Sequence, residues 1–163
     1  MTELLHKELT GVIIGAYYEV YNHTSRTYPE YIYERCMMQE LSRQRYAVTH
    51  QDEYQILYKG LPVGIQRLDL FVVQEIVVEN KVVEKITPLH RVQGLSYLKT
   101  VGKQVGLVFN FGGQEPEFDR IYLDPAKTVS SPSESILCDR TTLRDDLLYP
   151  DLARAIVGGL YEV

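Results

Sequence analysis

The 163-residue chain has few cysteines, and those it has are not arranged as a metal or disulfide framework. Cys36 and Cys138 lie about a hundred residues apart, and the sequence contains no CxxC pair and no cysteine–histidine cluster. A structural zinc site needs several such ligands close together in a recognisable pattern. We therefore expect two ordinary thiols in a reducing cytosol.

Long apolar runs are also missing from the sequence. No run approaches the roughly 20 residues that a membrane-spanning helix needs. The first ten residues, MTELLHKELT, carry early acids and lack the long apolar region of a signal peptide. These absences predict a cytoplasmic protein without a membrane partner.

The charge is not strong in either direction. Seventeen Lys and Arg against 22 Asp and Glu give a net charge of −5, which argues against a protein that coats nucleic acid through a general positive field. The length and the 45% hydrophobic content suit one domain with a substantial core and are too small for two comfortable domains.

Apolar residues at helical spacing predict two helices at the start of the chain. The first covers 4–22, and the second covers 29–45 with Pro29 in its first turn. The side chains expected to be buried are Leu5, Leu9, Val12, Ile13, Ala16 and Val20 in the first helix, and Ile32, Cys36 and Leu41 in the second.

The apolar period then changes to that of strands, with one further helix. Pro88 opens that helix and Gly102 ends it. The predicted order is an antiparallel meander of strands 54–58, 63–73 and 76–83, helix 88–101, a strand within 104–112 buried on both faces, and an edge strand 119–123.

Composition changes after residue 124. A Ser- and Pro-rich segment reads as a linker, and apolar residues over 143–157 return to helical spacing. We therefore divide the chain into a domain over 1–124 and a linker with a C-terminal helical extension over 125–163. The extension would pack on the core, on a protein partner or on a second copy in a homo-oligomer.

One group of polar residues stands out in the second and third predicted strands. Alternation places Leu68 and Leu70 on the face opposite Asp69, and it places Glu79 and Lys81 on one face of the next strand. A hairpin would bring Asp69 beside Glu79, where two carboxylates repel unless a cation lies between them. The plainer alternative is a solvated ion pair on a half-exposed strand.

The following helix adds polar groups and positive charge. Its polar residues His90, Gln93 and Tyr97 share one face at i, i+3 and i+7. From Lys81 to Lys103 there are five basic residues and one acid, so this stretch carries 5 − 1 = +4. Positive charge beside an acidic metal site suits a phosphodiester substrate.

These residues resemble the PD-(D/E)XK nuclease superfamily, whose pattern is an Asp, a spacer and then Glu-x-Lys. About residues 8–123 resemble the GxxExxY family, a small branch of that superfamily. The pieces that carry the likeness are ERCMMQEL, LYKGLPVGIQRLDLFV, ENKVVEKITPLHRVQGLSYLK and VGLVFNFG, with Glu30 and Tyr33 on the family's Glu-x-x-Tyr.

Three positions depart from the family pattern. Thr27 replaces the family's glycine, Leu68 replaces the proline before Asp69, and Asn80 stands where a hydrophobic residue is usual. None of them removes a charged catalytic residue.

The resemblance implies an α/β fold with a restriction-endonuclease-like core, in which a small mixed sheet is flanked by helices. It implies metal-dependent hydrolysis of DNA, with RNA as a further option.

The resemblance also implies residue roles. Asp69, Glu79 and the Asn80 main-chain carbonyl would hold Mg²⁺ or Mn²⁺, and Glu30 would hold a water molecule on the metal or a second ion. Lys81 would position the attacking water, and Gln93, Tyr97 and His90 would orient Lys81 or the substrate. The alternative is a catalytically silent interaction module or a subunit of a larger complex.

Overall fold

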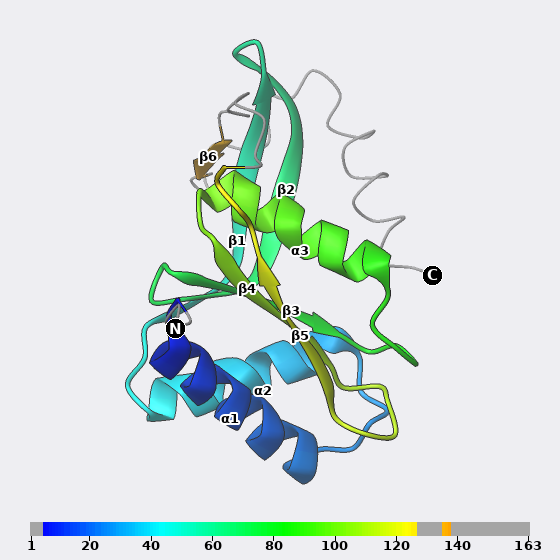
Figure 1. Cartoon of the computed structure of the whole chain (residues 1–163). Helices are drawn as coiled ribbons and strands as arrows, with labels where there is room; N and C mark the ends of the chain where they lie inside the picture. The colour runs from blue at the N-terminus through cyan, green and yellow to red at the C-terminus, as the bar shows by residue number, and fades with distance from the viewer. Residues whose placement is uncertain (1–4, 127–134, 138–163) are drawn as a thin grey trace.

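The structure is a computed structural model that describes residues 5–126 and 135–137. Three helices and six strands occur within these residues (Figure 1). In chain order they are α1 (Lys7–His23), α2 (Glu30–Arg43), β1 (Val48–Tyr58), β2 (Leu61–Val72), β3 (Ile76–Lys81), α3 (Pro88–Val101), β4 (Val105–Asn110), β5 (Glu117–Tyr122) and β6 (Ser135–Leu137).

The described strands form one mixed sheet in the order β5-β4-β3-β2-β1-β6. β1, β2 and β3 are an antiparallel meander, and β3 pairs in parallel with β4 through the α3 crossover. β5 closes one edge, as the sequence predicted, while β6 pairs with β1 at the other edge, where the sequence predicted no strand. The α/β architecture and the element order expected from the sequence are confirmed.

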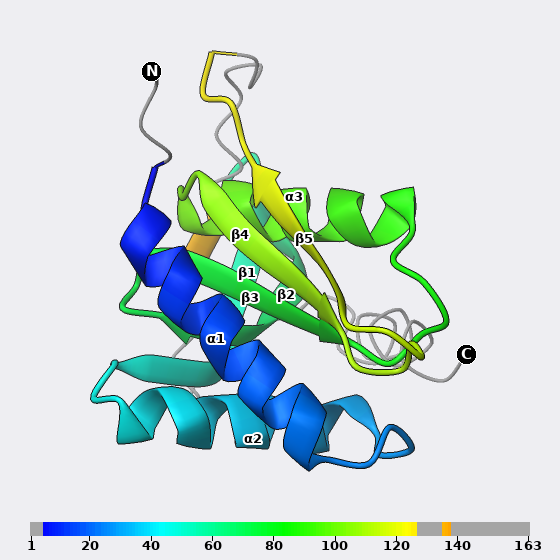
Figure 2. The ribbon, with the colours of Figure 1, turned by 60° about the horizontal axis from the view of Figure 1, so that its bottom comes forward.

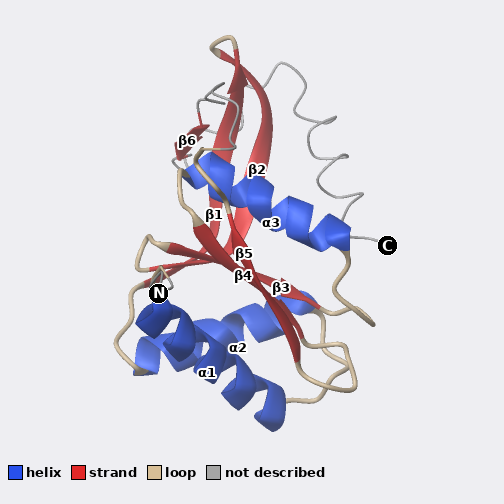
Figure 3. Cartoon of the chain, in the orientation of Figure 1, coloured by secondary structure: helices blue, strands red, loops and turns tan. Residues whose placement is uncertain are grey.

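Helices cover both faces of the sheet. α1 and α2 lie together on one face, and α3 lies on the other (Figure 2, Figure 3). Two hydrophobic clusters fill these layers: one joins α1 and α2 to the sheet around Met37 and Leu70, and the other joins α3 to the sheet around Leu98 and Val77. The second cluster is smaller, because a single helix covers that face.

Two expected burial patterns in the first helices need correction. Leu5 precedes α1 and is 41% exposed, whereas Tyr17 and Tyr21 are buried. In α2, Ile32 and Cys36 are only half-buried, and Tyr33, Glu34 and Met37 take the inner positions beside Leu41. Helical spacing predicts aliphatic residues at the inner positions, but tyrosines fill much of this layer because their rings pack and their hydroxyls find partners.

β1 starts six residues earlier than the predicted strand 54–58. Its first half, from Val48 to Glu53, is mostly polar and did not show a strand pattern. In the structure these polar groups have partners: His50 and Gln51 contact Glu34 of α2, and Glu53 pairs with Arg67 of β2. Tertiary partners therefore allow a strand that the apolar period does not predict.

The helical extension predicted over 143–157 lies outside the described residues. None of the described helices is long and apolar enough to cross a membrane.

Tyr17 ties α1 to the far end of the sheet. Its ring stacks on Phe109 with centroids 4.4 Å apart. Its hydroxyl donates to the Asn110 carbonyl at 2.8 Å and accepts from the Glu117 N–H at 2.9 Å. One side chain thus satisfies main-chain groups where β4 ends and β5 begins.

We predict that Tyr17→Phe lowers the free energy of unfolding by about 1–3 kcal/mol, because it leaves buried main-chain groups without their partner. Tyr18→Phe is the matched control, since the Tyr18 ring is 39% exposed, and its effect should stay within about 0.5 kcal/mol. Chemical denaturation of both variants measures the difference, and equal effects would contradict the anchoring role.

Candidate active site

The site forms where β2 and β3 separate. Their ladder ends at the pair Leu70 and Val78. Beyond it, the Asp69 carboxylate accepts a hydrogen bond from the main-chain N–H of Asn80, with Oδ2 to N at 2.8 Å. A side chain of β2 thus replaces the main-chain partner that β3 loses, and this contact fixes Asp69 against the next residues of β3.

Glu79 and Lys81 are buried rather than solvated. Glu79 is 1% exposed and Lys81 is 7% exposed. The Lys81 Nζ donates to Glu79 Oε1 at 2.5 Å. Their burial rules out the plainer alternative of a half-exposed surface pair, because ions are rarely buried this far without a specific reason.

Glu30 reaches the same place from the start of α2. Its Oε1 accepts from the N–H of Val82, the residue after Lys81, at 3.1 Å. The chain there is held from the other side by the residue after β4, since the Phe111 N–H donates to the Lys81 carbonyl at 2.8 Å. Gly112 is required beside it, because a Cβ at that position would lie 2.7 Å from the Val83 nitrogen.

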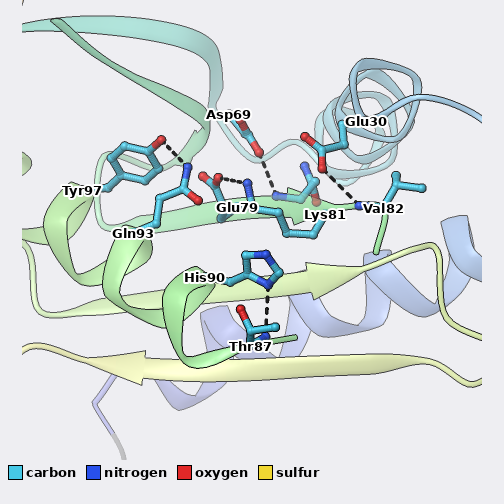
Figure 4. Close-up of polar contacts among 10 residues, drawn as sticks. Glu30, Asp69, Glu79, Lys81, Val82, Thr87, His90, Gln93 and Tyr97 are labelled. Atoms are coloured by element: carbon cyan, nitrogen blue, oxygen red, sulfur yellow. Dashed lines mark hydrogen bonds and ion pairs between the residues drawn. The ribbon is translucent and has the colours of Figure 1, made fainter. Parts of the chain in front are cut away.

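α3 supplies the neutral polar groups. Gln93 Nε2 donates to the Tyr97 hydroxyl at 2.8 Å, and Figure 4 shows this pair next to Glu79. His90 lies nearer to the helix start, where its Nδ1 accepts from the Thr87 N–H at 3.1 Å. His90 therefore helps to cap the N-terminus of α3.

The electrostatics of the cluster favour a cation. Burial, followed by repulsion from Glu79, raises the pKa of Asp69 well above its ordinary value. Burial also raises the pKa of Glu79, to about 7, despite the attraction of Lys81. Burial alone would lower the pKa of Lys81, but Glu79, with Asp69 and Glu30, raises it by more, and the net shift is upward. Lys81 is therefore a charged donor at neutral pH.

The structure corrects the alternation assumed around Asp69. Leu68 and Leu70 were expected on one face, but Leu68 belongs to the cluster under α3 and Leu70 to the cluster under α1 and α2. The alternation of inward and outward side chains along β2 therefore changes phase at Asp69: residues 68 and 70, two apart, point to opposite faces of the sheet. The sequence gives no signal of this change, because alternation is the ordinary geometry of a strand.

Sequence reasoning missed three residues near the site. Glu34 is 5% exposed, and its Oε2 accepts from His50 Nε2 at 2.7 Å and from Gln51 Nε2 at 3.0 Å. Its charge is also one of the contributions that raise the pKa of Asp69, after burial and Glu79. The sequence could have indicated Glu34, because it follows Glu30 by four residues and so shares a helix face with a residue already expected at the site.

Comparison with known proteins assigns the family. Residues 7–121 match the PD-(D/E)XK nuclease superfamily. The chain belongs to this superfamily. No curated protein and no solved structure gives a match. The match covers both helical layers and the sheet from α1 to β5, and it includes every residue of the cluster described above.

PD-(D/E)XK nucleases typically use divalent metals, and the residues present fit such an ion. Within the described part of the chain, the buried Oε2 of Glu79 has no hydrogen-bond partner. No group of three or more Asp, Glu, His or Cys side chains in that part is arranged around a metal position. Two carboxylates remain, which together with main-chain, water and substrate oxygens form a donor set that suits a divalent metal ion.

The positive stretch seen in the sequence is partly neutralised in the fold of this PD-(D/E)XK domain. Lys81 pairs with Glu79, Arg91 with Asp119 and Lys103 with Glu75. Lys85 and Lys99 are exposed. The stretch thus presents less free charge to a substrate than its sum of +4 suggests.

Two buried asparagines at neighbouring strand ends differ in their partners. Asn80 and Asn110 are both 0% exposed. Asn110 Oδ1 accepts from Val83 and Gly112, and its Nδ2 donates to Glu117. Neither polar side-chain atom of Asn80 has a hydrogen-bond partner among the described residues. The side-chain amide of Asn110 therefore has its hydrogen bonds, whereas burying the amide of Asn80 without them costs folding free energy.

We predict opposite signs for the same substitution at these positions. Asn80→Val should raise the free energy of unfolding by about 1–2 kcal/mol, because it removes unsatisfied polar atoms. Asn110→Val should lower it by about 1–3 kcal/mol, because it leaves main-chain donors unpaired. Denaturant titration of both variants is the measurement, and a loss of stability in Asn80→Val would show that its amide has a partner.

Proposed function

We propose that the protein hydrolyses DNA phosphodiester bonds with the help of Mg²⁺ or Mn²⁺, and that it belongs to the GxxExxY branch of the superfamily. One observation carries the proposal: Asp69, Glu79 and Lys81 converge in a buried cluster that contains an unpartnered carboxylate oxygen. Membership of a nuclease superfamily supports the activity. The resemblance of Glu30 and Tyr33 to the Glu-x-x-Tyr of the branch supports the branch.

In this proposal, Asp69, Glu79 and the Asn80 carbonyl hold the ion. When bound, the divalent ion supplies positive charge for the phosphate and acidifies water. Lys81 is the protonated donor that orients the attacking water or stabilises charge on the phosphate, because Glu79 keeps it charged. Glu30 holds a water molecule or a second ion near Val82.

Gln93 and Tyr97 orient Lys81 or the substrate strand. Their mutual hydrogen bond fixes the Gln93 amide on the side of Glu79 (Figure 4). An amide and a hydroxyl bring no charge into the cluster, so they can hydrogen-bond a phosphate or a base without altering the balance among the carboxylates.

A catalytically silent interaction module is the second candidate, and one contact favours it. The Lys81–Glu79 ion pair already neutralises one carboxylate without a metal ion. A fold that has lost its chemistry would keep such a pair for structure alone. Metal binding separates the two candidates.

We predict that Mn²⁺ raises the melting temperature of the wild-type protein and not that of Asp69→Asn. An ion at 100 times its dissociation constant stabilises the folded state by about 2.7 kcal/mol. Asp124→Asn is the control, since Asp124 lies after β5 and contacts the turn at Ala126. It should respond as wild type does. A wild-type protein without a Mn²⁺ response would favour the interaction module.

We predict that Lys81→Ala abolishes DNA cleavage while the Mn²⁺ response persists, because lysine serves the water or the phosphate and not the ion. The exposed Lys85, four residues later, gives the control Lys85→Ala, which should cleave as wild type does. Gln93→Ala should slow cleavage by an amount equivalent to about 1–3 kcal/mol, the value of an orienting hydrogen bond.

The assay is degradation of linear single- and double-stranded DNA, and of RNA, with each variant checked for folding. Activity that persists equally in Asp69→Asn and Lys81→Ala would come from a contaminant. Activity lost in Asp69→Asn and retained in Lys81→Ala would remove the role assigned to lysine.

A further inference from the structure

β1 and β2 share an irregularity at the position of Asp69. In their ladder, His50 pairs with Leu70 and Asp52 pairs with Leu68, and the register skips the intervening pair of Gln51 and Asp69. Gln51 has φ of 55°, which is left-handed backbone inside a strand. The phase change of β2 between Leu68 and Leu70 therefore faces a matching break in β1.

A carboxylate of α2 holds this break in place. Consecutive side chains of a regular strand point to opposite faces. Here the consecutive residues His50 and Gln51 both donate to the same oxygen of Glu34, at 2.7 and 3.0 Å. Both can reach one atom only because the backbone at Gln51 is not extended, so the contacts with Glu34 favour the left-handed conformation that a glutamine rarely adopts.

The break determines where Asp69 points. If β2 continued in regular phase, Leu68 and Leu70 would share a face, and one of them would leave its hydrophobic cluster. With the phase change, both leucines are 0% exposed and Asp69 is 6% exposed with its Oδ2 on the Asn80 N–H. The orientation of Asp69 is thus tied to the conformation of Gln51 across the strand pair.

We propose that Glu34 and Gln51 are positioning residues for Asp69: the Glu34 carboxylate holds the left-handed turn at Gln51, and that turn presents Asp69 to Asn80 and Glu79. Neither residue needs to contact the substrate. The role deepens the proposed metal-dependent reaction and rests on it for its functional consequence. Its structural consequence can be measured without any metal ion.

Four variants separate the contributions. Gln51→Val opposes the left-handed backbone because it is β-branched, whereas Gln51→Asn tolerates that backbone and loses only the reach to Glu34. Glu34→Gln keeps the shape and removes the charge. Lys59→Val is the matched control, since Lys59 also has left-handed backbone, with φ of 51°, but lies in the β1–β2 turn away from the site.

The first readout is the hydrogen-exchange protection of the Asn80 main-chain amide, which NMR measures in the metal-free full-length protein. We expect its protection to fall at least tenfold in Gln51→Val and several-fold in Glu34→Gln, and to stay near wild type in Gln51→Asn and Lys59→Val. Unchanged protection in folded Gln51→Val and Glu34→Gln would overturn the proposal. An equal fall in Lys59→Val would also overturn it, as a general loss of stability.

The second readout is the Mn²⁺ concentration that gives half of the full thermal stabilisation. It should rise about tenfold in Gln51→Val and remain near wild type in Gln51→Asn. If the wild type binds no Mn²⁺, the proposed function fails while the exchange experiment still decides the positioning role. If Gln51→Val does not fold, Glu34→Gln against Lys59→Val gives the same comparison.

Discussion

The hydrogen bond from the Asn80 N–H to the Asp69 carboxylate is the contact on which the site depends. It occupies the place where β2 leaves β3, after the ladder pair of Leu70 and Val78. A buried N–H without a partner is costly, so the separation of the strands requires a substitute acceptor. A carboxylate in that role satisfies the main chain and at the same time enters the cluster of Glu79 and Lys81.

Burial then gives the cluster its chemical character. Asp69 and Glu79 both have raised pKa values, chiefly because burial disfavours their charged forms. Lys81 offsets part of this cost, yet Glu79 Oε2 has no hydrogen-bond partner among the residues described. The cluster therefore buries two carboxylates at a cost in free energy, and groups perturbed in this way are common at functional sites.

Most of the fold could be predicted from the sequence, because the spacing of apolar residues and the Pro and Gly residues at helix ends depend on local sequence. Pro88 and Gly102 mark the ends of α3, and Gly102 has the left-handed conformation, with φ of 65°, that ends a helix. The start of β1 could not be predicted, because its polar residues are satisfied by α2 and β2. The candidate residues Asp69, Glu79 and Lys81 could be chosen from spacing and resemblance, whereas Glu34, His50 and Gln51 depend on a contact between a helix and a strand distant in sequence.

The spacing of Asp69 and Glu79 shows why the motif alone is ambiguous. With Leu70 opposite Val78, continued pairing would place Asp69 directly opposite Glu79, where facing side chains have Cβ atoms about 4.5–5.5 Å apart. Any antiparallel hairpin of this length would do the same, so the spacing indicates proximity and nothing more. What separates this chain from an ordinary hairpin is that Asp69 is not paired with either neighbouring strand. The ladder with β3 ends there, and the ladder with β1 skips Gln51. Asp69 is thereby released from the sheet on both sides, and its carboxylate is free to serve the site because the strand around it is not regular.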